Sequence, residues 1–185
     1  YLQREFYNHS DQFNWGLSQL AEDTDWVIRI DADEYLTIDL INEISKKLPL
    51  IDQSINGILV PRLIKFQGKI IRHGGFSPSY ILRIFRYGKG KCQNRWMDEH
   101  IIVNGDTCKF KSFLIDANKR HLDWWLKKHN KYASKEVIEL LDIKYRFLNR
   151  ANLNHNEQKR TKLQIRKFIY YKIPIQFRSS LFFLY

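Results

Sequence analysis

Three carboxylates close together form the most informative group in the sequence: Asp31, Asp33 and Glu34. They follow residues 26–30, which are mostly apolar and have the length and β-branched content of a buried strand. In open α/β sheets ligands bind beyond the carboxyl ends of the strands, so these acids lie where a site is expected. In an extended chain Asp31 and Asp33 project to the same side, which would let them share one hard cation.

A solvated acidic turn is the alternative interpretation of these carboxylates, because an Asp-x-Asp pair is short and often occurs by chance. Carboxylates that lie close together repel one another unless a cation or a proton lies between them. A purely structural role would therefore be costly, and this favours a cation site.

Two further groups of residues could contribute to a site. Asp98, Glu99 and His100 follow a predicted short strand and could supply a general base, a metal ligand or both, although a charged hairpin edge has the same composition. The adjacent Gly74 and Gly75 would let backbone amides approach a ligand closely, but such pairs also occur in ordinary hairpin loops.

Capping residues, turn residues and apolar spacing predict the elements that position these groups. Ser10 is expected to cap a helix that runs to about residue 22, and Thr37 to cap a helix that Pro49 ends. A third, long helix is expected to bury an apolar stripe that includes Tyr132 and Leu141. The second and third helices are expected to cover residues 38–48 and 122–148. Strands are expected at 26–30, 56–67, 69–72 and 80–86. Residues 101–103 are expected to pair with 107–113 in a hairpin.

The composition indicates one globular domain with a real core, because 44% of the 185 residues are hydrophobic and 15% are aromatic. Cys92 and Cys108 lack the spacing of metal ligands, so two reduced thiols in a cytosolic compartment are expected. The chain opens on Tyr1 and ends in an apolar run, so we expect it to be a piece of a longer protein.

The positive charge is concentrated in the last part of the chain. The net charge is +11, yet residues 1–108 have 13 Lys and Arg against 14 Asp and Glu, whereas residues 109–185 have 18 against 6. Such asymmetry points to a polyanionic partner, with a solvated basic face as the alternative.

Several segments in this order resemble the family 2 glycosyltransferases of bacterial lipopolysaccharide-core and exopolysaccharide biosynthesis. The resemblance extends over residues 8–148 and is carried by five motifs. These are TDWVIRIDADEYL at 24–36, IRHGGF at 71–76, LRIFR at 82–86, RWMDEH at 95–100, and WWLKKHNKYA at 124–133 followed by Glu136.

The resemblance implies an α/β fold of the GT-A type, the Rossmann-like fold of nucleotide-diphospho-sugar transferases, with a mixed central sheet and a helical C-terminal part. Residues 1–148 would be a partial catalytic domain that lacks the N-terminal βαβ nucleotide-binding unit, and 149–185 a basic amphipathic extension. Without that unit, the chain on its own is expected to be inactive.

The resemblance also implies a metal-dependent reaction, because the diphosphate leaving group of a nucleotide sugar needs Mg²⁺ or Mn²⁺. Asp33 would bind the metal directly, Asp31 would bind the metal or the donor ribose, and Glu34 would support the cluster. Asp116 stands where such enzymes often have a metal-binding histidine, with His121 close by in the sequence.

Glu99, with Asp98 as the alternative, would be the general base that takes the proton of the acceptor hydroxyl. In-line attack of that hydroxyl on the anomeric carbon would invert its configuration in one step. The remaining residues implied in donor or acceptor binding are Arg72, His73, Gly74, Gly75, Arg95, His100 and Lys128.

The expected partners are a nucleotide-sugar donor, a lipid-linked saccharide or polysaccharide acceptor and a membrane surface, with no nucleic acid. The expected location is the cytoplasm, peripheral on the inner face of the bacterial plasma membrane, because the basic segment suits an anionic bilayer. Two other classes stay open. A haloacid dehalogenase-type phosphatase also has a strand followed by Asp-x-Asp, and a non-catalytic basic module would bind membrane or nucleic acid.

Overall fold

The chain is a mixed α/β protein in a computed structural model that describes residues 2–72, 77–93, 100–145 and 173. It divides into two compact units, Tyr1–Arg120 and His121–Tyr185. The predicted boundary after residue 148 and the predicted extension, apart from Ile173, lie outside the described residues.

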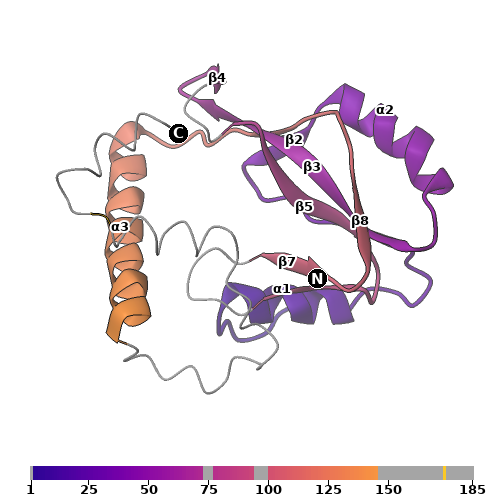
Figure 1. Ribbon diagram of the computed structural model, residues 1–185, viewed down its shortest axis with the longest axis horizontal. Coiled ribbons are helices and arrows are strands. Elements are labelled where there is room, and N and C mark those ends of the chain that lie inside the picture. Colours follow the sequence, from indigo (N-terminus) through magenta and orange to yellow (C-terminus); the bar gives the residue numbers. More distant parts are fainter. Residues whose placement is uncertain (1, 73–76, 94–99, 146–172, 174–185) are drawn as a thin grey trace. The chain divides into compact units, whose positions relative to one another are not determined.

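A curled, mixed sheet forms the centre of the first unit (Figure 1). Five strands lie in the order β1-β5-β3-β9-β2, and β4 and β8 also pair with β3. β3 pairs antiparallel with β4 and β5 but parallel with β8 and β9, so the predicted α/β class with a mixed sheet is confirmed. The strands are β1 (Trp26–Ile28), β2 (Glu34–Leu36), β3 (Ile55–Phe66), β4 (Lys69–Ile71), β5 (Ser79–Arg86), β8 (Asp106–Lys109) and β9 (Leu114–Asp116).

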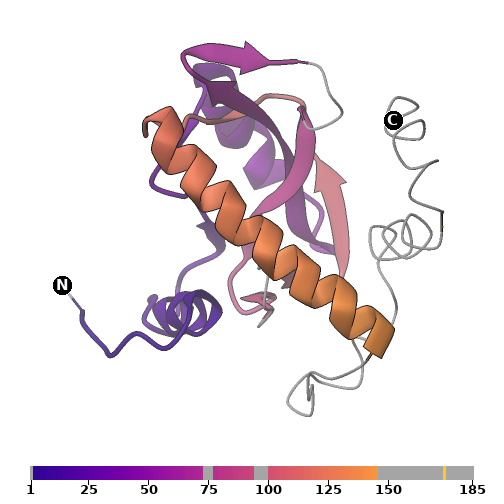
Figure 2. The same cartoon turned by 90° about the vertical axis from the view of Figure 1, so that its left-hand side faces the viewer.

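Helix α2 (Ile38–Lys47) packs against this sheet through a fully buried cluster (Figure 2). The side-chain oxygen of Thr37 accepts a hydrogen bond from the Leu40 amide at 3.2 Å, and a 3₁₀ turn with Pro49 follows the helix, so the predicted cap and end are confirmed. The cluster consists of Leu40, Ile58, Val60, Ile84, Phe110 and Leu114.

Helix α1 (His9–Ser18) differs from the predicted helix at both ends. The side chain of Asn8 caps it by accepting from the Asp11 amide at 2.7 Å, whereas Ser10 lies buried in the first turn and donates to Asn8. The amides of Gln19 and Leu20 bond three residues back, which tightens the last turn and ends the helix before residue 22.

The strand after α1 is shorter and more exposed than predicted. β1 covers only Trp26–Ile28, and within the described residues it pairs with β5 alone. Ile28 is 37% exposed and Ile30, which lies outside the strand, is 46% exposed, so the prediction of a buried strand over residues 26–30 is wrong.

The predicted hairpin of residues 101–103 with 107–113 is also wrong. β7 (Ile101–Val103) pairs antiparallel with β6 (Gly90–Cys92) in a separate two-stranded sheet, and β8 runs parallel to β3. Pairing with β3 brings Cys108 and Phe110 to the buried cluster, and the burial of this apolar surface favours the observed arrangement.

The second unit contains α3 (Leu122–Tyr145), which starts where the sequence predicts. The expected burial of its apolar stripe is wrong, because Tyr132 is 43% and Leu141 40% exposed. The predicted helix end at residue 148 lies outside the described residues. No helix within the described residues is long and apolar enough to cross a membrane.

Candidate functional site

The acidic residues after β1 form a closed turn rather than an extended strand. The Asp31 carbonyl accepts from the Glu34 amide at 2.9 Å, and the Glu34 Oε2 atom accepts from the Asp31 amide at 3.1 Å. The strand alternation used to place Asp31 and Asp33 on one side therefore does not apply, since residues 31–34 turn between β1 and β2.

Arg83 forms ion pairs with two of the three carboxylates. Its Nη2 atom donates to Asp31 Oδ2 at 2.7 Å and to Glu34 Oε1. Arg83 and Glu34 are both buried, and a buried charge needs such a partner. The cation that the clustered acids require thus comes, at least for this pair, from the protein itself.

Arg83 was not predicted to be part of the site, although the sequence contains a signal for it. Arg83 interrupts the apolar run of residues 81–85 in β5, at the point where the register with β3 shifts. A charged residue within such an apolar run calls for a buried partner of opposite charge.

Asp31 also contacts Arg29, whose Nε lies 3.2 Å from Asp31 Oδ1. Burial raises the pKa of Asp31, but the opposing effects of Arg83 and Arg29 are larger together, so its pKa lies below the ordinary value. Since 41% of its side chain is exposed, the Asp31 carboxylate is partly accessible to solvent.

Asp33 has the most accessible carboxylate of the turn. Its backbone carbonyl accepts from the Ala117 amide at 2.8 Å, which fixes the residue to the segment after β9. Its Oδ2 atom accepts from the side-chain Nδ2 atom of Asn118 at 3.4 Å, and the residue is exposed. This carboxylate is thus held in place while its oxygens stay accessible to a ligand.

Asp116, the predicted third ligand, lies directly opposite Glu34 on the neighbouring strand. Its Oδ2 atom is 3.5 Å from Nη1 of Arg62, so it forms an ion pair there. Within the described residues, no three His, Cys, Asp or Glu side chains are grouped to hold one metal ion. The structure therefore does not bring Asp31, Asp33 and Asp116 together as three ligands, and metal binding by any of them stays a prediction.

The other predicted site residues have separate contacts or lie outside the described residues. Arg72 is exposed after β4, and the carbonyl of His100 accepts from the Gln93 amide at 2.9 Å. Lys128 belongs to the second unit, where its ammonium lies 5.0 Å from the centre of the Trp124 ring. The predicted residues outside the described part of the chain are His73, Gly74, Gly75, Arg95, Asp98 and Glu99.

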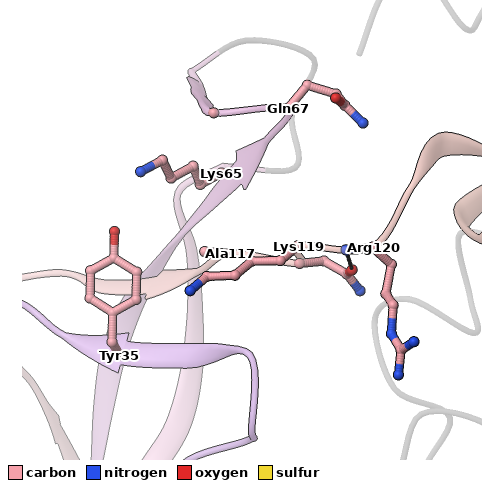
Figure 3. Close-up of a pocket in the computed structure, with 8 residues that line it drawn as sticks. Tyr35, Lys65, Gln67, Ala117, Lys119 and Arg120 are labelled. Atoms are coloured by element: carbon pink, nitrogen blue, oxygen red, sulfur yellow. Dashed lines mark hydrogen bonds between the residues drawn. The ribbon is translucent and has the colours of Figure 1, made fainter.

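A pocket of about 460 Å³ lies in the first unit (Figure 3). It is connected to the acidic turn through Asn118, which lines the pocket and contacts Asp33, and through Tyr35 of β2. The pocket was not predicted, because it combines segments that are distant in the chain. Its lining residues are Tyr35, Lys65, Gln67, Gly68, Ala117, Asn118, Lys119 and Arg120.

No protein-family model matches the chain, and no curated protein matches it in sequence. Its function is therefore inferred from the residues and their geometry.

Proposed function

We propose that the chain is part of an inverting, metal-dependent glycosyltransferase with a GT-A-type fold. It would move a sugar from a nucleotide-diphosphate donor to a lipid-linked or polysaccharide acceptor in bacterial envelope or exopolysaccharide synthesis. The observation that carries this proposal is the acidic turn after β1, in which Arg83 holds Asp31 and Glu34 while Asp33 stays accessible.

The donor atoms of this turn suit Mg²⁺ or Mn²⁺, which prefer carboxylate oxygens. Asp33 would be the direct ligand, and Asp31, ionised because its pKa is lowered, would supply a second oxygen or bind the donor ribose. The metal, when bound, would stabilise the negative charge that develops on the leaving diphosphate.

Two protein carboxylates are sufficient for such a site. Mg²⁺ in phosphate-binding sites is commonly held by one or two carboxylates, with substrate phosphates and water as the other ligands. The guanidinium groups of Arg29 and Arg83 next to Asp31 weaken binding of a free cation, so the metal should bind best together with the donor diphosphate.

Glu34 has a supporting role in this proposal. Its side chain is 2% exposed, accepts a hydrogen bond from the Asp31 amide and forms an ion pair with Arg83. It therefore fixes the turn that presents the two aspartates. Glu99, or Asp98 in its place, would take the proton of the acceptor hydroxyl.

The test is release of nucleoside diphosphate by the full-length protein from a panel of nucleotide sugars, with Mn²⁺ or Mg²⁺ and with a chelator. Release from one donor that stops with chelator and in Asp33→Asn, but continues in the control Asp23→Asn, would support the proposal. Asp23 is a suitable control because it is an exposed acid before β1. Release that survives Asp33→Asn, or phosphate release from a phosphomonoester in place of donor turnover, would contradict it.

A further inference from the structure

The pocket in the first unit has a one-sided charge. Three of its eight lining residues are cationic, namely Lys65, Lys119 and Arg120, and none is acidic. Figure 3 shows the Lys65 and Lys119 side chains extending toward Tyr35, whereas Arg120 extends away from it. The pocket therefore has a positive wall on the side of Tyr35.

The lysine charges in this wall are not neutralised by the described part of the protein. Neither Lys65 nor Lys119 forms an ion pair with an acid in the residues that the structure describes. Like charges that face one cavity repel each other and together create a positive potential that attracts anions. An anionic ligand would remove this repulsion.

The backbone also allows a ligand to approach. Gln67 and Gly68 form the turn between β3 and β4 with φ values of 49° and 80°. Gly68 has no other atoms within 4 Å of the position where a Cβ would lie, so this wall of the pocket is open.

The size of the pocket indicates a ligand larger than a phosphate ion. Its volume of about 460 Å³ is in the range of small-molecule sites. The ring of Tyr35, which is 46% exposed, offers an apolar face with a hydroxyl at its edge. A saccharide has matching apolar faces and hydroxyl groups, so a phosphorylated saccharide fits both walls.

We propose that this pocket binds the phosphorylated end of a saccharide acceptor through Lys65 and Lys119, without a metal ion. The naming of the ligand as the acceptor rests on the proposed function. The donor diphosphate would be neutralised by the metal at Asp33, whereas the pocket supplies its own positive charges. The 3.4 Å contact between Asn118 and Asp33 places the pocket next to the acid proposed to bind that metal.

The test measures binding of glucose 1-phosphate to the full chain by calorimetry in the presence of a chelator. Free glucose and a nucleoside diphosphate serve as the uncharged and the donor-like probes. Lys65→Gln and Lys119→Gln are compared with Lys91→Gln, which removes the same charge from an exposed position on β6 outside the pocket. Thermal melting of each variant verifies that it folds.

We expect the sugar phosphate to bind without metal and at least tenfold more tightly than glucose. Each pocket variant should weaken it about tenfold, because a hydrogen-bonded charge pair is worth at least about 1.4 kcal/mol, while Lys91→Gln leaves it unchanged. The proposal would be overturned if the sugar phosphate did not bind, or if the folded pocket variants bound it as tightly as the wild type. It would also be overturned if Lys91→Gln weakened binding equally, or if the nucleoside diphosphate bound more tightly without metal.

This result is separable from the proposed function. Metal-free binding of the sugar phosphate alongside absent donor turnover would remove the glycosyltransferase assignment but keep the anion site. Metal-dependent donor turnover without such binding would keep the enzyme and remove the pocket from its acceptor site.

Discussion

The guanidinium of Arg83 donates a hydrogen bond to the buried carboxylate of Glu34, which is 49 residues away in the sequence. This contact joins β5 to the start of β2 across the acidic turn. The same Nη2 atom also donates to Asp31, so one guanidinium holds both ends of the turn.

Replacing Arg83 should lower the free energy of unfolding of the protein. Arg83→Met leaves Glu34, whose side chain is 2% exposed, without its cation. Removal of one partner of a buried ion pair costs about 3–5 kcal/mol, and we expect a loss of that order in the free energy of unfolding from urea titration.

The double variant Arg83→Met/Glu34→Met provides the control for this prediction. It removes both charges together, so most of the lost stability should return. If the single variant were within about 1 kcal/mol of the wild type, the ion pair would not hold the turn in the way proposed.

The ionisation of Asp31 should depend on Arg29 as well as on Arg83. Burial raises its pKa, but the two arginines together lower it below the ordinary value. In Arg29→Met the pKa of Asp31, measured by carboxyl carbon NMR, should rise. An unchanged pKa would show that Arg29 does not act on this carboxylate despite the 3.2 Å contact.

The stability of the first unit should fall in acid because of Glu43. Burial raises the pKa of Glu43, but hydrogen bonds from Lys47 and from the amides of Ser112 and Lys111 outweigh it and lower the pKa to about 2. The depressed pKa stabilises the folded state above the ordinary value of 4.5, and this contribution is lost as the pH falls toward 2.

The linked free energy is at most about 3.5 kcal/mol, because each pKa unit corresponds to about 1.4 kcal/mol. Glu43→Gln should therefore be less stable at pH 7 and should lose less stability between pH 5 and 2 than the wild type, as urea titrations at several pH values would measure. Glu22→Gln, at an exposed position, is the matched control and should behave like the wild type. Parallel pH profiles for Glu43→Gln and wild type would contradict this account.

Local signals in the sequence are sufficient for part of the fold. Thr37 and Pro49 delimit α2, because capping and the missing proline amide act within a few residues. The predicted strands 56–67 and 69–72 are joined by a turn at residues 67 and 68, both with positive φ, one residue earlier than those bounds imply. The partner of β8 could not be predicted, because burial of Phe110 against distant strands decides it.

The candidate site was predictable to a similar extent. The acids at 31, 33 and 34 lie between the end of β1 and the start of β2, where Arg83 joins Asp31 to Glu34, and their role as a metal site stays a prediction. Their cationic partner Arg83 was not predicted, since the contact depends on the register between β1 and β5. The pocket was not predicted either, because Lys65 and Lys119 are far apart in the sequence and line one pocket only in the folded protein.

The most direct test of the proposed metal site is a titration of the full-length protein with Mn²⁺, followed by electron paramagnetic resonance, with and without a nucleoside diphosphate. We expect the diphosphate to tighten Mn²⁺ binding, Asp33→Asn to abolish that tightening, and Asp23→Asn to retain it. Equal diphosphate-dependent binding of Mn²⁺ by wild type and Asp33→Asn would contradict the claim that Asp33 binds the metal of the donor.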